Sequence, residues 1–316
     1  MKVVVTGGAG FVGSHLCRRL LDEGHTVLCV DNYITGSTRN IVALRAHPNF
    51  HVIQHDVTQP FHYEADAIFH MASPASPIGY MEHPIETILA NTQGTHNMLE
   101  AARKQNALFL VSSTSEIYGD PLVHPQVESY WGNVNPIGPR ACYDESKRLG
   151  ETLTMEYVRQ YGLNARIVRI FNTYGPNSQI KDGRMIPNFI TGALKNETLV
   201  VYGDGQKTRS ICYVSDLVDG LMRAMFRENT RGEVFNLGNP DEHTVLEYAH
   251  TIIKLCQSSS TLIFEPDRVD DPERRQPNIS KAKAVLGWEP KIGMEEGLRQ
   301  TIAWFRTQLP NLSTVS

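Results

Sequence analysis

The chain has 316 residues, of which 41% are hydrophobic and 20% are charged, an ordinary composition for a soluble globular protein with a sizeable core. Its formal net charge is −4, with 30 Lys and Arg residues against 34 Asp and Glu residues. This balance gives no reason to expect a nucleic-acid-binding surface. It does not exclude a small anionic substrate, because only the local charge of a pocket matters for such a ligand.

The first half of the sequence alternates apolar runs with amphipathic stretches. Between the first two runs, "SHLCRRLLDEG" has a helical period and ends at Gly24. Strands that are apolar throughout suit a parallel sheet covered on both faces. The repetition of strand, helix and strand predicts an α/β fold with a doubly wound parallel (Rossmann-type) sheet. The predicted strands are residues 2–6, 26–31, 51–57, 67–73, 108–113 and 165–171.

The pattern loosens after about residue 175, which predicts a smaller mixed C-terminal lobe interleaved with returns to the sheet. We expect a Rossmann domain formed by residues 1–175 plus roughly 208–240, and a lobe formed by residues 176–207 plus 241–316. Short strands are expected near 199–202, 209–214 and 233–239, and helices near 186–196, 215–228, 244–256 and 294–305.

Five scattered cysteines form no CxxC pair and no Cys/His spacing typical of a metal site, so we expect neither a disulfide framework nor a metal. The chain starts on "MKVVVTGG", without the charged region and cleavage site of a signal peptide. No apolar run approaches the length that spans a bilayer. These features predict a protein of the cytoplasm with no membrane partner.

The strongest single motif is "VVVTGGAGFVGSHL", in which Gly7, Gly10 and Gly13 follow the first strand and open a helix. Such a turn needs glycine for its backbone angles and for close approach, and the helix N-terminus offers N–H groups to a pyrophosphate. The motif therefore predicts a dinucleotide site, and the alternative is a glycine-rich turn without a ligand.

Asp31 ends the second predicted strand, where a carboxylate can accept hydrogen bonds from the adenosine ribose and would repel a 2′-phosphate. NAD is therefore favoured over NADP as the cofactor. Arg39 lies nearby and weakens the exclusion of NADP slightly. A strand-end turn residue without a ligand is the alternative interpretation of Asp31.

A candidate catalytic pair stands in "YDESK", where Tyr143 and Lys147 are spaced to share one face of a helix. A nearby ammonium group stabilises a phenolate and lowers the pKa of the phenol, which could then take a proton from a sugar hydroxyl. The tract "SSTSEIYG" follows a strand and adds the hydroxyls of Thr114 and Ser115 and the carboxylate of Glu116. Open α/β sheets bind ligands at that edge.

Together with "RIFNTYGP", these motifs resemble the extended short-chain dehydrogenase/reductases that act on nucleotide sugars. Four further stretches resemble the UDP-glucuronic acid decarboxylases, or UDP-xylose synthases, within that family. They are "MASPASP" (71–77), "HPQVESYWGNVNPIGPRACYDESKR" (124–148), "NLGNPDEHT" (236–244) and "LGWEPK" (286–291). The likeness covers essentially the whole chain.

The resemblance implies a carboxy-lyase with tightly bound NAD that converts UDP-glucuronate into UDP-xylose. The sugar would be oxidised at C4, lose CO2 from the 4-keto intermediate, and be re-reduced by the bound NADH. A ketone at C4 makes the substrate a β-keto acid, so the electrons left at C5 can delocalise into the carbonyl. The lobe would bind the nucleotide sugar. The family also implies a homodimer through helices near 85–104 and 143–161.

The resemblance also implies roles for individual residues. Residues implied in NAD binding, beside Gly7 and Gly13 of the turn, are Gly10, Phe11, Val12, Asp31, Asn32, Thr35, Gly36, Asp56, Val57, Ser73, Tyr143, Lys147, Thr173 and Arg184. Residues implied in holding the sugar nucleotide are Asn172 and Arg209, with Asn97, Tyr157 and Gln160 nearby.

Two positions distinguish this chain from related dehydratases, as the resemblance implies. Those enzymes carry an acid where this chain has Ser115, and a serine cannot protonate a departing hydroxyl. In "DDPERRQPNI", Arg275 aligns with an arginine of the decarboxylases, and we assign it to the substrate carboxylate as a planar fork suited to bidentate binding. Arg274 is expected to face solvent or nucleotide. The alternative is that both arginines pair with Asp270, Asp271 and Glu273 at the surface.

Two other functions stay open at this stage. A nucleotide-sugar 4-epimerase or 4,6-dehydratase would share the fold and the Tyr–Lys pair, and Ser115 and Arg275 argue against them. A catalytically silent NAD-sensing protein on the same fold is a third hypothesis, because fold alone does not fix function. The intact Tyr143, Lys147 and Glu116 argue against it.

Overall fold

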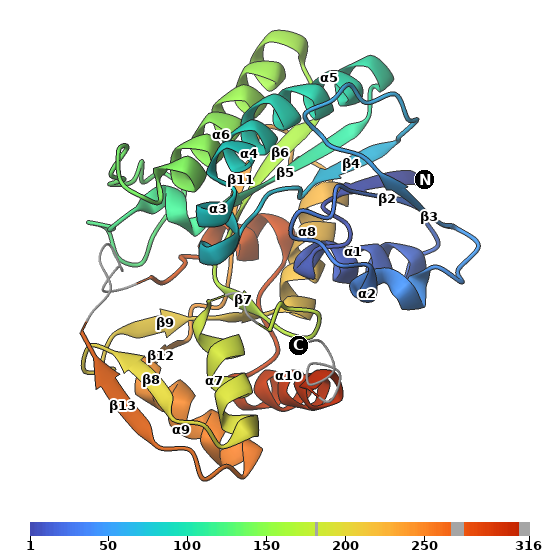
Figure 1. Ribbon diagram of the computed structural model, residues 1–316. Helices are drawn as coiled ribbons and strands as arrows, with labels where there is room; N and C mark the ends of the chain where they lie inside the picture. The colour runs from blue at the N-terminus through green and yellow to red at the C-terminus, as the bar shows by residue number, and fades with distance from the viewer. Residues whose placement is uncertain (181–182, 267–274, 310–316) are drawn as a thin grey trace.

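A seven-stranded sheet, with every strand parallel to its neighbours, forms the centre of the protein (Figure 1). The structure is a computed structural model that describes residues 1–180, 183–266 and 275–309. The strand order is β11-β6-β5-β4-β1-β2-β3, which reverses beside β1 as in a doubly wound fold. The strands are β1 (Lys2–Thr6), β2 (Thr26–Asp31), β3 (Phe50–Gln54), β4 (Ala67–His70), β5 (Leu108–Thr114), β6 (Ala165–Ile170) and β11 (Val234–Leu237).

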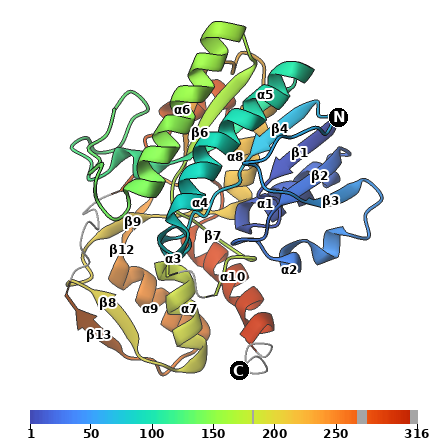
Figure 2. The same ribbon diagram turned by 45° about the horizontal axis from the view of Figure 1, so that its top comes forward.

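Helices cover both faces of this sheet, which explains why its strands are apolar throughout. On one face lie α1 (Phe11–Asp22) and α8 (Val214–Phe226), which pack against each other. On the other lie α5 (Thr95–Gln105) and α6 (Ala141–Tyr161), which pack together in the same way (Figures 1 and 2). Each layer encloses its own cluster of buried apolar side chains.

Shorter helices and turns connect the strands on the cavity side. The segment before α5 contains α3, α4 and a π-helical turn, and the segment after β5 contains a 3₁₀ turn. These elements are α2 (Thr38–Ile41), η1 (Val42–Leu44), α3 (Pro77–Glu82), α4 (Pro84–Leu89), η2 (Ala90–Gly94) and η3 (Ser115–Tyr118).

The smaller lobe lies beyond the C-terminal ends of the sheet strands (Figure 1). Its three helices pack against one another around paired short strands, β8 with β13, β9 with β12, and β7 with β10. The elements are β7 (Thr173–Tyr174), α7 (Met185–Lys195), β8 (Leu199–Tyr202), β9 (Thr208–Ser210), β10 (Cys212–Tyr213), β12 (Glu242–Thr244), α9 (Val245–Cys256), β13 (Leu262–Glu265) and α10 (Met294–Gln308). The π-helical turn η4 (Ala282–Leu286) precedes α10 in the chain.

The predicted fold class is confirmed, with two differences in detail. The single strand expected at 209–214 is two strands, because Arg209 pairs with His243 and Cys212 pairs with Thr173 in different sheets. The turn η4, expected in the lobe, packs against the helix α8 and against the strand β11 of the large sheet. Within the described residues, none of the helices has the length and apolar character needed to cross a membrane.

Candidate active site

The glycine-rich turn after β1 leaves no room for a side chain at Gly7 or Gly13. Gly7 has a φ of 67°, and a Cβ there would lie 2.9 Å from the backbone of Ala72. A Cβ on Gly13 would lie 2.1 Å from the carbonyl oxygen of Gly7. Gly10 is the N-cap of α1, whose first N–H groups have no partner within the helix. The turn is thus a cradle for an anion such as a pyrophosphate.

Asp31 stands at the end of β2, buried beside this turn. One carboxylate oxygen accepts a hydrogen bond from the Ala9 N–H at 2.9 Å, and the other accepts from the Tyr33 N–H at 2.8 Å. A Cβ on residue 36 would lie 2.6 Å from the carboxylate of Asp31, so glycine at this position leaves the room that the carboxylate needs. Burial raises the pKa of Asp31, and the two backbone hydrogen bonds oppose the rise. The carboxylate therefore also fixes the turn itself.

A cavity of about 1190 Å³ lies between the C-terminal ends of the sheet strands and the lobe. Its lining includes every residue expected to bind NAD. They are Gly7, Gly10, Phe11, Val12, Gly13, Asp31, Asn32, Thr35, Gly36, Asp56, Val57, Ser73, Tyr143, Lys147, Thr173 and Arg184. Together with the cradle at the glycine turn, this lining fits a dinucleotide. Lining the cavity is a matter of position, and the contacts of each residue with NAD stay predictions.

The residues expected at the reacting sugar line the same cavity. Thr114 ends β5, Ser115 and Glu116 follow it, and Arg275 comes from the C-terminal part of the chain. Asn172 and Arg209 line the cavity on the lobe side, where the Asn172 carbonyl accepts the Cys212 N–H at 2.8 Å.

Three of the implied substrate residues do not reach the cavity, which corrects their expected placement. Asn97 on α5 donates to the carbonyl oxygen of Val57 at 2.9 Å, and so supports the loop after β3. Tyr157 on α6 donates to Glu100 of α5 at 2.7 Å. Gln160, near the end of α6, is exposed and is not among the lining residues. The physical reason is that both helices turn these positions toward each other or toward solvent.

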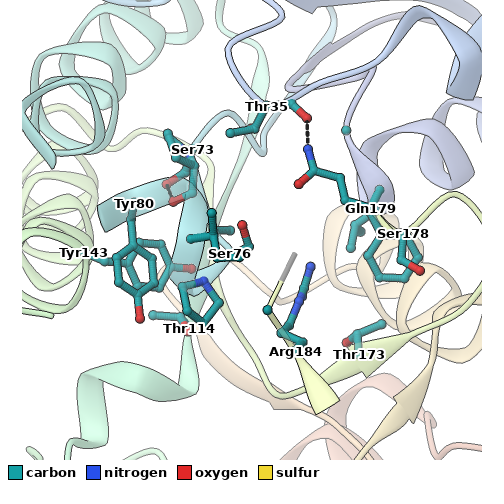
Figure 3. Close-up of a pocket in the computed structure, with 18 of the residues that line it drawn as sticks. Thr35, Ser73, Ser76, Tyr80, Thr114, Tyr143, Thr173, Ser178, Gln179 and Arg184 are labelled. Atoms are coloured by element: carbon teal, nitrogen blue, oxygen red, sulfur yellow. Dashed lines mark hydrogen bonds between the residues drawn. The ribbon is translucent and has the colours of Figure 1, made fainter. Parts of the chain in front are cut away.

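Tyr143 and Lys147 lie one turn apart near the start of α6, as their spacing predicts. The Lys147 ammonium group is 5.8 Å from the centroid of the Tyr143 ring and donates to the Ser112 carbonyl at 2.8 Å. Tyr80 of α3 stacks on Tyr143, with ring centroids 5.1 Å apart and planes 9° from parallel (Figure 3). The phenol is thus held between a stacked ring and the strand β5.

Burial dominates the electrostatics of this pair, which corrects one expectation. It raises the pKa of Tyr143, and the hydrogen bond with Thr114 lowers that pKa by less. Burial also lowers the pKa of Lys147 to about 7. In the protein alone the pKa of the phenol is therefore raised overall, because removal from water opposes its charge more than the neighbouring groups favour it.

A buried charge cluster lies beside this pair. Arg275 spans both carboxylate oxygens of Glu116, with Nη2 at 3.1 Å from Oε2 and Nη1 also donating to Oε1. Arg140 donates to the same Oε2 from the start of α6. Burial opposes ionisation of Glu116, but the two guanidinium groups outweigh it and lower the pKa of the carboxyl group. Glu116 is therefore held as a carboxylate.

The side chain of Arg275 is only 9% exposed, so it is not a surface charge. Its chain segment is fixed by Gln126, whose backbone N–H donates to the Gln276 carbonyl and whose side-chain oxygen accepts from the Gln276 N–H, both at 2.9 Å. The Gln126 carbonyl also accepts the Asn278 N–H at 2.8 Å. The predictions for Arg274, Asp270, Asp271 and Glu273 lie outside the described residues.

Four residues of this neighbourhood had no role in the sequence prediction. Arg140 and Gln126 stand in the tract 124–148, whose resemblance to the decarboxylases was noted as a whole. Tyr80 shows no motif. Asp144 is 7% exposed, one carboxylate oxygen has no hydrogen-bond partner, and burial raises its pKa to about 7. Of these four residues, Arg140 had a sequence signal, because it stands directly before the helix that carries Tyr143 and Lys147.

The fold, the glycine turn and the Tyr–Lys pair at the sheet edge define a class of NAD-binding enzymes. The chain belongs to the NAD dependent epimerase/dehydratase family, whose pattern matches residues 3–238. This finding makes NAD the cofactor and supports the predicted nucleotide-sugar chemistry.

Relatives narrow this class. The chain is 53% identical over 308 residues to UDP-glucuronic acid decarboxylase 1 of Danio rerio, covering 98% of this chain and 73% of the relative. It is 53% identical over 310 residues to UDP-glucuronic acid decarboxylase 6 of Arabidopsis thaliana, covering 98% and 90%. The solved UDP-glucuronic acid 4-epimerase of Bacillus cereus, in complex with UDP-glucuronic acid and NAD, superposes with a TM-score of 0.87. It is 27% identical, with 97% and 99% of the two chains covered.

Proposed function

We propose that the protein is an NAD-dependent UDP-glucuronate decarboxylase that forms UDP-xylose. The observation that carries this proposal is the buried Arg275, which reaches the cavity from the far end of the chain and lies against Glu116, beside Tyr143. A buried guanidinium at the reacting end of a nucleotide-sugar cavity suits a sugar that bears a carboxylate. The names of the relatives at 53% identity support the same substrate.

The first chemical task falls to Tyr143, which takes the proton of the C4 hydroxyl as a phenolate while Thr114 donates to the phenol oxygen. The positive charge of the oxidised nicotinamide would favour that phenolate against the effect of burial. NAD, held by the glycine turn and Asp31, supplies the hydride acceptor and donor when it is bound. Lys147 is fixed by the Ser112 carbonyl, so its ammonium group stays on the same face of α6 as the phenol. These residues position the sugar ring and store one proton through the reaction.

The second task is loss of CO2, for which a ketone at C4 accepts the electron pair released at C5. Arg275 orients the carboxylate, and it accelerates the step only if it holds the carboxylate less tightly than the transition state. The enolate left by CO2 then takes one proton at C5 from water, and Glu116 lies at this end of the cavity as a carboxylate next to the phenol. Ser115 lacks the acidity to protonate a departing hydroxyl, so dehydration has no proton donor at this place.

A 4-epimerase is the second candidate, because the Bacillus cereus neighbour is an epimerase solved with UDP-glucuronic acid. Both reactions begin with oxidation at C4 and both need a cation for the carboxylate. They differ in the fate of that carboxylate, which an epimerase retains. The discriminating measurement is therefore release of CO2.

The test is to incubate purified protein with UDP-glucuronate labelled with ¹³C at C6, with and without added NAD. We expect labelled CO2 and a pentose product identified by NMR as UDP-xylose. Tyr143→Phe protein serves as the blank for chemistry outside the site. UDP-galacturonate without CO2 would establish the epimerase instead, and no conversion of either kind would refute both.

We further propose that the protein forms a homodimer through α4 (Pro84–Leu89), α5 and α6. Large apolar side chains are exposed on this side, with Ile85 62%, Leu89 45%, Leu149 48% and Tyr161 50% exposed. Exposed apolar side chains gathered on neighbouring helices favour association. Light scattering of wild type and Leu149→Glu protein tests the proposal. A wild-type mass equal to one chain would refute it.

A further inference from the structure

Arg140 lies where the catalytic helix and the carboxylate of Glu116 meet. It is the N-cap residue of α6, and its carbonyl accepts the N–H groups of Tyr143 at 3.0 Å and Asp144 at 3.2 Å. Its side chain reaches back to Glu116, which follows β5, and lines the cavity. One residue therefore joins the strand-end tract to the turn of helix that carries the phenol.

Two guanidinium groups, Arg140 and Arg275, converge on the carboxylate of Glu116. All three side chains are largely buried, at 24%, 9% and 15% exposed for Arg140, Arg275 and Glu116. Charges in such a place are costly unless they are paired in good geometry. Loss of either guanidinium would therefore change both the position and the ionisation of Glu116.

The two arginines are not equivalent partners of Glu116. Arg275 forms a two-pronged contact with both oxygens, the geometry that would fit an incoming carboxylate equally well. Of the two oxygens, Arg140 donates to Oε2, and its backbone is fixed in the same helical turn as Tyr143. Arg275 therefore has the fork geometry for the substrate carboxylate, and Arg140 has the fixed position needed to hold Glu116.

We propose that Arg140 is a positioning residue that keeps Glu116 in place and ionised while Arg275 binds the carboxylate of the substrate. The inference rests on the proposed function for the identity of that substrate. Its part concerning Arg140 and Glu116 is a property of the protein alone.

Several groups face Glu116 and shape its titration. Arg140, Tyr143 and Asp144 come from α6 and its cap, Arg275 from the segment before η4, and Tyr80 from α3. The arginines favour the carboxylate form, and an ionised Asp144 opposes it. Removing Arg140 therefore moves ionisation of Glu116 to higher pH. It moves ionisation of Asp144 in the same direction, since Arg140 also favours that carboxylate.

Steady-state kinetics of the NAD-loaded enzyme with UDP-glucuronate provide the first test. We expect Arg140→Gln to lower kcat about 10- to 10²-fold, the scale of a lost charge-assisted hydrogen bond, with little change in KM. The acidic limb of the kcat profile should move to higher pH, and Arg140→Lys should restore most of both. The same shift in an Asp144→Asn background excludes Asp144 as its source. A raised KM with unchanged kcat, or an unmoved acidic limb, would overturn the proposal.

Carboxyl NMR of ¹³C-glutamate-labelled, NAD-loaded protein without a nucleotide sugar provides a test that does not depend on turnover. The Glu116 resonance is assigned by its loss in Glu116→Gln protein. It should titrate at higher pH in Arg140→Gln than in wild type, and close to wild type in Arg140→Lys. Equal titration in wild type and Arg140→Gln would overturn the role of Arg140. Failure of wild type to convert UDP-glucuronate would instead overturn the proposed function and leave this comparison valid.

Discussion

The glycine turn and the charge cluster line one cavity and are built in different ways. The turn is formed mainly by seven consecutive positions, Gly7 to Gly13, with the Ala72 backbone close to Gly7 and Asp31 accepting from the Ala9 N–H. The cluster joins Glu116, Arg140 and Arg275, which are far apart in sequence. The comparison teaches that cofactor binding is a local backbone property here, whereas substrate choice depends on long-range packing of charges.

If this division holds, substitutions in the glycine turn should lower NAD content and substitutions in the charge cluster should lower kcat/KM. Substitution of Tyr143 should lower kcat without loss of NAD. We expect Tyr143→Phe to lower kcat by roughly 10³-fold or more, because the proton acceptor is lost. Bound NAD, measured after denaturation and release, should stay at the wild-type level. Tyr80→Phe keeps the stacked ring and is the matched control, with activity near wild type. Normal turnover in Tyr143→Phe would contradict the assignment.

The charge cluster is tested by Arg275→Gln. We expect kcat/KM for UDP-glucuronate to fall about 10²- to 10³-fold, the scale of breaking a buried ion pair, with NAD content unchanged. Arg18→Gln, at an exposed position on α1, is the matched control. A variant with wild-type kcat/KM would show that Arg275 does not bind the substrate carboxylate. Loss of bound NAD in Arg275→Gln protein would show that the charge cluster also affects cofactor binding.

The large sheet could be predicted from the sequence because each of its strands is a continuous apolar run with its own local signal. Residues 2–6 and 26–31 were predicted with the observed bounds of β1 and β2. The strand β13 was missed, since its apolar run, Leu262 to Phe264, is only three residues long and ends at Glu265. The division into β9 and β10 was missed because it depends on two different partner strands.

The same distinction applies to the site. Glycine spacing and the Tyr–Lys interval are local, so both were predictable, whereas the placement of Arg275 came from family resemblance. The role of Gln126 depends on backbone pairing with residues 276 and 278, which no local pattern encodes. The raised pKa of Tyr143 was also beyond prediction, because it depends on burial beneath Tyr80 and the rest of the fold.

The glycine turn is tested by Gly13→Ala. The added Cβ would lie 2.1 Å from the Gly7 carbonyl oxygen, a backbone atom that cannot move aside cheaply. We expect a loss of about 3 kcal/mol in the free energy of unfolding, the upper part of the range for overpacking, together with loss of bound NAD. Gly293→Ala, where nothing lies within 4 Å, is the control. Urea unfolding and NAD content check both. Unchanged stability and NAD content in Gly13→Ala protein would mean that close backbone packing of the glycine turn does not determine cofactor binding.

Asp144 tests the charge cluster through pH. Burial raises its pKa to about 7 in the folded protein, above its ordinary value, so the folded state binds more protons than the unfolded state between those two values. Wild-type stability should therefore fall as pH rises toward 7. Asp144→Asn should be more stable than wild type at pH 8 by about 1 to 2 kcal/mol, and by less at pH 5.5. Asp22→Asn, at an exposed position, should show neither effect. A difference independent of pH would contradict the titration.

Gln179 connects the loop after β7 with the cofactor side of the cavity, and its substitution has the smallest expected effect. Its side-chain amide donates to the Thr35 carbonyl at 2.5 Å, joining the loop after β7 to the loop after β2 across the cavity (Figure 3). We expect Gln179→Ala to speed NADH release about two- to fivefold, the scale of one exposed hydrogen bond, with kcat unchanged. Stopped-flow fluorescence measures the release. Gln179→Glu has the same shape but cannot donate, so it should match Ala. If Gln179→Glu protein released NADH at the wild-type rate, the hydrogen bond to Thr35 would not be what retains the cofactor. The side chain would then retain NADH by covering it.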